Sequence, residues 1–197
     1  MQGLADGYFV LPYTIGDYLA DDIRTGPIST ASPEFEEAEQ RVQTQIDAFI
    51  NNKGTKTVDY FHRKLGKIIW NKCGMSRNET ALKEAMAEVK ALREEFYKDV
   101  FVPGTADSFN EPLAKALRVA GFLELGELFA KDALVRTESC GGHFREESQT
   151  PEGEALRDDD NFTFVSAWEY KGEPSDAKLH KEALNYENIE LKTRSYK

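Results

Sequence analysis

The stretch "SRNETALKEAMAEVKALREEF" (residues 76–96) carries the pattern that decides the fold. Its apolar side chains recur every three or four residues, and these are Leu82, Ala85, Val89, Leu92 and Phe96. This spacing places them on one face of an α-helix, while lysines and glutamates occupy the other faces. Ser76 and Glu79 fit a capping box, which predicts that the helix begins there. We expect this helix to bury its apolar stripe against neighbouring helices.

Two preceding segments carry similar stripes. In the first, apolar residues recur every seven positions after the Ser32–Pro33 pair, a favourable helix start; they are Phe35, Val42 and Phe49. In the second, the stripe precedes Gly74, a predicted C-terminal cap, and it consists of Val58, Phe61, Leu65 and Ile68. Short polar connections between such helices indicate antiparallel neighbours. The sequence therefore predicts a three-helix bundle of the spectrin-repeat kind.

A fourth helical segment, Glu111 to Thr137, is apolar over most of its circumference. Its large apolar residues are Leu113, Leu117, Val119, Phe122, Leu123, Leu125, Leu128 and Phe129. A helix that is apolar nearly all round is buried on several sides. We expect it to pack on the bundle and also on a further surface.

Helical periodicity ends beyond Gly141. Two later segments, Phe162–Tyr170 and Leu184–Leu191, are rich in aromatic and β-branched residues and are typical of strands. A two-stranded hairpin is expected, lying on another surface because a lone hairpin is only marginally stable. The predicted fold class is mainly α: a three-helix bundle, a further long buried helix, and an extended C-terminal tail with a β-hairpin.

Composition narrows the functional classes. The 197 residues carry a net charge of −10, which argues against nucleic-acid binding because phosphate contacts need a basic face. The longest uncharged run, Gly7–Gly16, is too short to span a bilayer, so no direct membrane insertion is expected. No signal peptide is recognised. Cys73 and Cys140 are interpreted as reduced thiols, and a cytoplasmic protein is predicted.

The side chains best suited to catalysis or metal binding lie in "RTESCGGHFREE" (136–147). Cys140 and His143 form one C-x₂-H pair, which Cys73 and His62 would have to complete from a distance. Structural zinc sites usually have two such short spacings, so a metal site is disfavoured. Cys140 lies beside Gly141, whose amide could stabilise an oxyanion, but His143 is too close in sequence to imply a catalytic geometry. We therefore predict no catalytic, cofactor-binding or metal-binding residue.

The same stretch, with "EGEALRDDDNFTFVSAWEY" (152–170) and "LHKEALNYENIELKTRSYK" (179–197), resembles the C-terminal part of the flavoprotein subunit of succinate dehydrogenase and fumarate reductase. That family has an R-x-E-S-R-G-x-H-x-R-x-D pattern followed by an R-D-D triplet. The matching residues are Arg136, Glu138, Ser139, Gly141, His143, Arg145, Arg157, Asp158 and Asp159. Cys140 replaces the usual Arg, and Glu147 stands near the usual acidic position. Both departures resemble the branch that is paired with a single cytochrome b membrane subunit.

The resemblance implies three parts. Residues 1–30 would be the last helix of the FAD-binding domain and a linker, residues 31–137 the helical bundle domain, and residues 138–197 the extended tail. The family's FAD and substrate residues precede the part that this chain resembles, so the parent subunit would hold FAD and this chain would hold no cofactor. The parent would exchange hydride between FAD and succinate or fumarate. It would pass electrons to an iron–sulfur subunit, which would pass them to a membrane cytochrome b subunit. It would lie on the inner face of the cell membrane, with this chain in a structural and assembly role.

Two alternatives remain at this point. The chain could be an autonomous helical interaction module, or the C-terminal domain of an L-aspartate oxidase-like flavoenzyme, which shares the E-S-R-G-x-H core. The tryptophan-containing hairpin and the "RSYK" ending favour the dehydrogenase.

The resemblance also suggests a role for the 136–145 motif. Arg136, Glu138, His143 and Arg145 are expected at the junction of the helical domain with the FAD domain or the iron–sulfur subunit, where Arg136, Glu138 and Arg145 form ion pairs against a neighbouring surface. The Gly-Gly pair at 141–142 would permit the chain to turn there.

Overall fold

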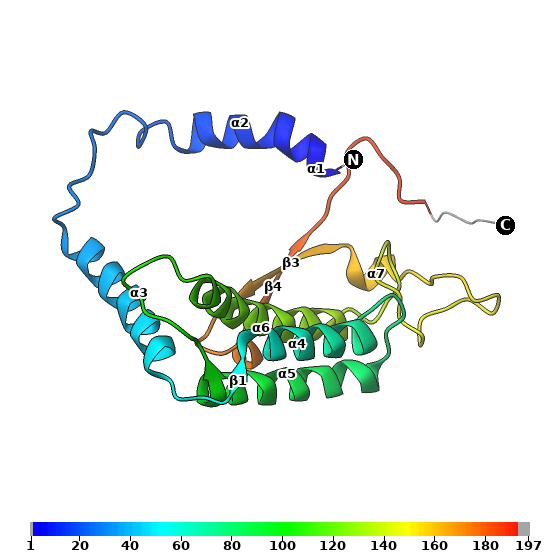
Figure 1. The fold of residues 1–197 in the computed structure, drawn as a ribbon. Helices are drawn as coiled ribbons and strands as arrows, with labels where there is room; N and C mark the ends of the chain where they lie inside the picture. Colours follow the sequence, from blue (N-terminus) through cyan, green and yellow to red (C-terminus); the bar gives the residue numbers. More distant parts are fainter. Residues whose placement is uncertain (1, 193–197) are drawn as a thin grey trace. The chain divides into compact units, whose positions relative to one another are not determined.

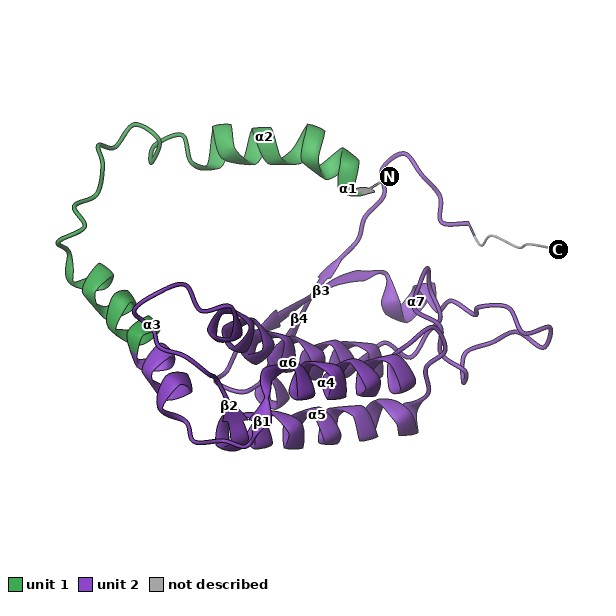
Figure 2. Cartoon of the chain, in the orientation of Figure 1, with its two compact units in different colours: residues 1–43 green, residues 44–197 purple. Residues whose placement is uncertain are grey.

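The computed structural model describes residues 2–192, and the chain divides into two compact units, residues 1–43 and 44–197 (Figures 1 and 2). The "RSYK" ending lies outside the described residues. The first unit begins with consecutive helical segments that alternate between α- and π-type hydrogen bonding: α1 (Gln2–Ala5), η1 (Asp6–Val10), α2 (Leu11–Tyr13) and η2 (Thr14–Tyr18). Pro12, which has no N–H to donate, lies between the two π segments. None of residues 3–43 is buried.

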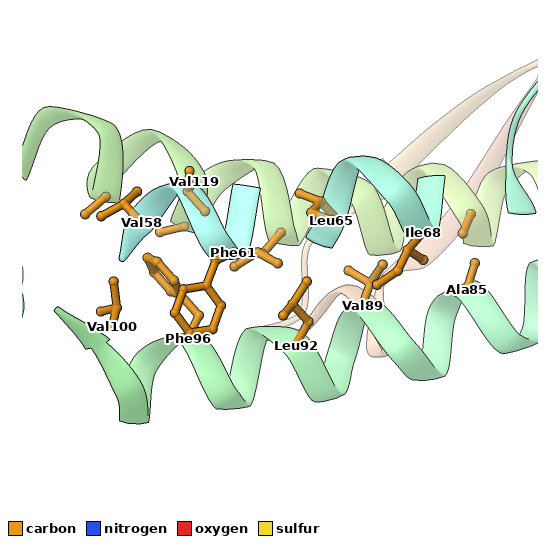
Figure 3. Close-up of a cluster of buried hydrophobic side chains, with 14 of the residues drawn as sticks. Val58, Phe61, Leu65, Ile68, Ala85, Val89, Leu92, Phe96, Val100 and Val119 are labelled. Atoms are coloured by element: carbon orange, nitrogen blue, oxygen red, sulfur yellow. The ribbon is translucent and has the colours of Figure 1, made fainter. Parts of the chain in front are cut away.

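The core lies in the second unit and is built by three helices, α4 (Val58–Lys72), α5 (Glu79–Asp99) and α6 (Glu111–Val135). Figure 3 shows their apolar side chains meeting between the helices. Phe61 and Phe96, on α4 and α5, contact edge-to-face at 5.2 Å between ring centroids. Asp59 pairs with Lys115 near the starts of α4 and α6, and Lys72 pairs with Glu84. These contacts show that α5 runs antiparallel to α4, whereas α6 runs parallel to α4.

The mainly α prediction is confirmed, but α3 (Pro33–Asn51) contributes less to the bundle than its stripe suggested. Phe49 is buried at 2% exposure, whereas Phe35 and Val42 are 46% and 48% exposed. The third helix of the core is instead α6, whose buried positions include Ala116, Ala120 and Ala130. A seven-residue spacing identifies a possible packing face, but it does not say which other helix will cover that face.

Two predicted helix ends differ in detail. The N-cap of α5 is Asn78, not Ser76, because the Asn78 side chain accepts from the N–H of Ala81 at 2.8 Å. Ser76 instead donates to the carboxylate of Glu146 at 2.7 Å. Helix α4 ends at Lys72 with Cys73 as its C-cap. Gly74 follows without a positive φ, and a Cβ there would come within 2.6 Å of the Trp70 carbonyl oxygen.

Two short strands join the ends of α4 and α5. Strand β1 (Lys56–Thr57) pairs in parallel with β2 (Val100–Phe101). Next to this pair, a Cβ on Gly54 would lie 2.2 Å from the main chain of Asp99, so only glycine allows the two segments to approach so closely. The bundle is thereby closed at the end where α4 begins and α5 finishes.

The predicted hairpin forms, but its second strand was misplaced. Strand β3 (Phe164–Glu169) pairs antiparallel with β4 (Lys178–Ala183), with Ser166 opposite Lys181. The prediction put the second strand at 184–191. The true strand has the polar sequence "KLHKEA" and is exposed at every position except Leu179. It therefore lacks the apolar alternation that marks a half-buried strand and that would have identified it. Two short elements accompany the hairpin: α7 (Asp159–Phe162) before it and η3 (Pro174–Asp176) between its strands.

Candidate functional site

The segment after α6 returns to the connection between α4 and α5. At its tip Cys140 and His143 exchange both main-chain hydrogen bonds, at 2.9 and 3.0 Å, and Gly141 has φ +59°. The Gly-Gly pair therefore permits the turn that the sequence predicted. Farther along, the main-chain N–H of Arg77 donates to the carbonyl of Phe144 at 3.0 Å, and the main-chain carbonyl of Arg77 accepts from the N–H of Glu146 at 2.8 Å. We call six residues held together here the polar clasp: Arg77, Arg136, Glu138, His143, Arg145 and Glu147.

Arg145 closes the C-terminal end of α6. Its side chain is buried, with the residue only 2% exposed. Its Nη1 donates to the carbonyls of Ala133 and Leu134, both at 3.1 Å. The last carbonyls of a helix have no partner within the helix, and this end carries a partial negative charge. The buried guanidinium of Arg145 donates hydrogen bonds to these carbonyls, and its positive charge is favourable beside the partial negative charge.

Glu147 has the complementary role at the N-terminal end of α5, where its carboxylate accepts from a free main-chain N–H. Its Oε1 accepts from the N–H of Glu79 at 2.6 Å, and its Oε2 accepts from Nε of Arg145 at 3.1 Å. Burial acts to raise the pKa of Glu147, but the bonds from Glu79 and Arg145 outweigh it and hold that pKa below its usual value. The carboxylate therefore stays ionised, where the helix dipole favours negative charge.

His143 joins two of the arginines. Its Nε2 lies 2.7 Å from the carbonyl oxygen of Arg136, and its Nδ1 lies 2.8 Å from Nη1 of Arg77. Since a carbonyl only accepts and a guanidinium only donates, Nε2 carries the proton and Nδ1 is the acceptor. Burial lowers the pKa of His143, as do the charges of Arg77, Arg145 and Arg136, while the bond to the Arg136 carbonyl acts against this. The imidazole is neutral with both nitrogens engaged.

Glu138 and Arg136 extend the clasp towards the hairpin. Glu138 is 4% exposed; it pairs with Nη1 of Arg136 and accepts from the N–H of Asp158 at 2.9 Å. Arg136 also donates to the carbonyls of Phe162 and Phe164, at 3.3 and 3.2 Å. Arg136 and Glu138 thus pair with each other and Arg145 pairs with Glu147, within this chain; the expected contact of these residues with a neighbouring surface stays a prediction.

The R-D-D triplet lies beside this group. Arg157 donates from Nε and Nη2 to Asp159 at 2.9 and 2.6 Å. Asp158 is the N-cap of α7, accepting from the N–H of Asn161 at 3.3 Å. The residues of this triplet therefore stabilise the start of α7 and the segment before it.

Sequence reasoning missed the residues that anchor the hairpin on α6. Lys131 donates to the carbonyls of Ser175 and Ala177, both at 2.8 Å, and its ammonium lies 4.9 Å from the centre of the Trp168 ring. The indole N–H of Trp168 donates to Asp132 at 2.7 Å. The available signal was the adjacent pair of Lys131 and Asp132 near the end of a helix rich in apolar residues.

A buried ion pair inside the bundle was also missed. Arg93 of α5 and Glu127 of α6, 9% and 1% exposed, lie 3.2 Å apart, and Arg93 also pairs with Glu173. Burial raises the pKa of Glu127, although Arg93 acts to lower it. A glutamate among the apolar residues of α6 was the signal.

The remaining reactive side chains are separate from one another. Cys140 is exposed and Cys73 is buried, and burial raises the pKa of the Cys73 thiol. The ring of His62 lies against Phe122 at 5.7 Å. Within residues 2–192, no three His, Cys, Asp or Glu residues are grouped so that they could hold a metal ion. In the same range, no helix has the length and apolar content that crossing a bilayer requires.

Comparisons with known proteins show which family this chain is similar to in sequence. A family model described as the fumarate reductase flavoprotein C-terminus matches residues 62–196. The fumarate reductase flavoprotein subunit of Proteus vulgaris is 27% identical over 148 residues, which cover 72% of this chain and 24% of that protein. The corresponding protein of Helicobacter pylori is 28% identical over 131 residues, covering 66% and 18%. The succinate dehydrogenase flavoprotein subunit of Rickettsia bellii is 26% identical over 121 residues, covering 61% and 20%.

Solved structures agree on the fold. A quinol–fumarate reductase with menaquinol molecules superposes with a TM-score of 0.66 at 22% identity, over 86% of this chain and 28% of that chain. The Mycobacterium smegmatis Sdh1 complex gives 0.66 at 23% identity, over 86% and 27%. The chain spans less than a third of the length of these relatives. With the family match covering more than half of its residues, this chain belongs to the C-terminal domain family of the fumarate reductase and succinate dehydrogenase flavoproteins.

Proposed function

We propose that this chain is the helical C-terminal domain of a flavoprotein subunit that interconverts succinate and fumarate through FAD. The observation that carries the proposal is the family match over residues 62–196, which includes the whole polar clasp. In this proposal FAD and the dicarboxylate are bound by a portion of the subunit outside the matched segment, because the relatives are several times longer than the part that aligns.

The chain's own role is structural. The clasp supports this, because its charged groups are engaged at helix ends. Arg145 is bonded to Ala133, Leu134 and Glu147, and both ring nitrogens of His143 are occupied. A catalytic acid, base or electrophile needs an atom that can reach the substrate.

The clasp also gives a physical basis for the assembly role. Glu138 and Arg145 are buried, so in this proposal they fix the conformation of the loop rather than touch a partner. Exposed Cys140 and Glu146, held by that loop, would meet the FAD-binding domain or the iron–sulfur subunit. Electrons would pass from FAD to the iron–sulfur subunit, then to a membrane cytochrome b subunit, with the flavoprotein lying peripherally on the inner face of the cell membrane.

Two preparations test this function. The purified chain should show no flavin absorbance and no succinate-dependent dye reduction, whereas the complete flavoprotein subunit that contains it should show both. A chain that carries flavin by itself, or a complete subunit without activity towards succinate and fumarate, would contradict the proposal.

A further inference from the structure

The connection between β3 and β4 is bound to the helical core at two places. We call this connection, residues 170–177, the strap; it contains the short η3 helix. At the first place the carboxylate of Glu173 pairs with Nη2 of Arg93 on α5. At the second place the ammonium of Lys131 on α6 donates to two carbonyls of the strap, both at 2.8 Å. Both anchors lie within the second unit.

At the first anchor one nitrogen of Arg93 serves two carboxylates. Nη2 of Arg93 donates to Oε2 of Glu127 at 3.2 Å and also to Oε2 of Glu173. Within residues 2–192, Nε of Arg93 has no hydrogen-bond acceptor, although the residue is only 9% exposed. Nε and Nη2 point to the same side of a guanidinium, so a single carboxylate can accept from both. The docked arrangement therefore leaves a buried donor without an acceptor, which is unfavourable.

The two carboxylates differ in their freedom to leave Arg93. Glu127 is 1% exposed in the interior of α6, whereas the side chain of Glu173 is 49% exposed and belongs to a connection between strands. Burial raises the pKa of Glu127; Arg93 acts to lower it, and the charge of Glu173 acts to raise it further. When both are ionised, the two carboxylates therefore repel each other while they share one cation. Glu173 is the one that can move away.

We propose that Arg93 is an exchange switch for the strap: it holds Glu173 while the strap is docked, and it gives Nε and Nη2 to Glu127 when the strap leaves. Release is then less unfavourable than the loss of an ordinary partly buried ion pair, because the guanidinium keeps a charged partner. The strap can therefore detach and dock again while α4, α5 and α6 stay packed. The switch needs neither FAD nor a second subunit.

Labelling of thiols with iodoacetamide measures how often the strap opens. Ala177 is 8% exposed, so in a chain with Ala177→Cys the introduced thiol reacts when the strap is released. Cys140→Ser removes the exposed native thiol. Cys73, 2% exposed at the end of α4, remains and reports on opening of the bundle. Mass spectrometry of peptides resolves the two labelling rates and so separates opening of the strap from opening of the core.

Glu127→Gln, made in this labelling background, is the decisive variant. It removes the alternative partner of Arg93 and the repulsion against Glu173, so the introduced thiol should react about threefold more slowly. Glu173→Gln should make the introduced thiol react about tenfold faster, while the rate at Cys73 stays within about twofold. Glu94→Gln, the same change at an exposed residue next to Arg93, is the control and should leave both rates within about twofold.

Unchanged or faster labelling of the introduced thiol in Glu127→Gln, with the Cys73 rate unaltered, would overturn the exchange switch, because Glu127 would then not compete with Glu173. An unchanged rate in Glu173→Gln would overturn it as well. If Glu127→Gln makes both thiols react at one common rate, the bundle itself has opened and Glu127→Asp decides. That variant keeps the charge but withdraws it from Arg93, so slower labelling of the introduced thiol supports the switch, and labelling at the wild-type rate or faster overturns it.

Discussion

Arg145 donates to the carboxylate of Glu147 across 3.1 Å, and this pair connects the C-terminal end of α6 to the N-terminal end of α5. Each partner also binds the main chain of its helix end, at Ala133 and at Glu79 respectively. Each charge therefore has the sign that its helix terminus favours. Two residues separated by one position in sequence thus hold together two helices of the bundle.

Arg145→Ala should destabilise this chain by about 1–3 kcal/mol, because it leaves the carbonyls of Ala133 and Leu134 at the end of α6 without their donor. The sequence predicted that Arg145 pairs against a neighbouring surface, whereas Arg145 is 2% exposed and its partner Glu147 lies in this chain. Urea unfolding measures the difference. Lys115→Ala removes the exposed pairs with Glu111 and Asp59 and should cost no more than about 1 kcal/mol. Equal small losses in both variants would show that the Arg145 contacts contribute little.

The stability of the chain should depend on pH through His143. Its pKa in the folded state is lowered, chiefly by burial, so below the unfolded pKa of about 6.5 the unfolded state takes up more protons. The His143 contribution is therefore fully present above about pH 6.5 and declines as the pH falls towards the folded pKa. Protonation of Nδ1 would also place a second donor against Arg77.

Urea midpoints measured from about pH 7.5 to about pH 5.5 check this dependence. His143→Gln should show a shallower loss of stability on acidification than the wild type. Parallel curves for the wild type and His143→Gln would remove His143 as the titrating group.

Val89→Asp should unfold the domain or cost several kcal/mol, since Val89 is 0% exposed and an unpaired carboxylate there cannot be solvated. Val42→Asp is the matched control. Val42 belongs to a similar sequence stripe but is 48% exposed, so its change should stay within about 0.5 kcal/mol. Thermal unfolding followed by circular dichroism compares the two. A strong loss in Val42→Asp would mean that α3 packs more extensively in solution.

Lys131→Met should loosen the hairpin while leaving the bundle intact. The substitution keeps the apolar stem of the side chain but removes the bonds to the carbonyls of Ser175 and Ala177, at a cost of about 1–3 kcal/mol. Hydrogen exchange should accelerate in residues 164–169 and 178–183 more than in α4 or α5. Lys178→Met, at an exposed position of β4, should change neither region. Uniform acceleration across the chain would contradict a local anchoring role.

The sequence by itself determined the helices of the core and the turn after α6. The α5 stripe from Leu82 to Phe96 was buried as expected, because a period near 3.6 residues defines a helix face through local geometry alone. The turn at Gly141 was likewise predictable, since φ +59° suits glycine and few other residues. These features depend on residues close to one another in the chain.

Tertiary structure decided which faces meet and which polar groups pair. The similar stripes on α3 and α5 have different fates: Val42 is exposed and Val89 is buried. Strand β4 has almost no pattern of its own and exists because β3 pairs with it. Arg77 and His143, 66 positions apart, meet only after the bundle brings the end of α4 beside the end of α6. Charge and spacing identify residues that can form such bonds, but the partner is chosen by distance in the folded chain, where burial leaves each polar group a small set of neighbours.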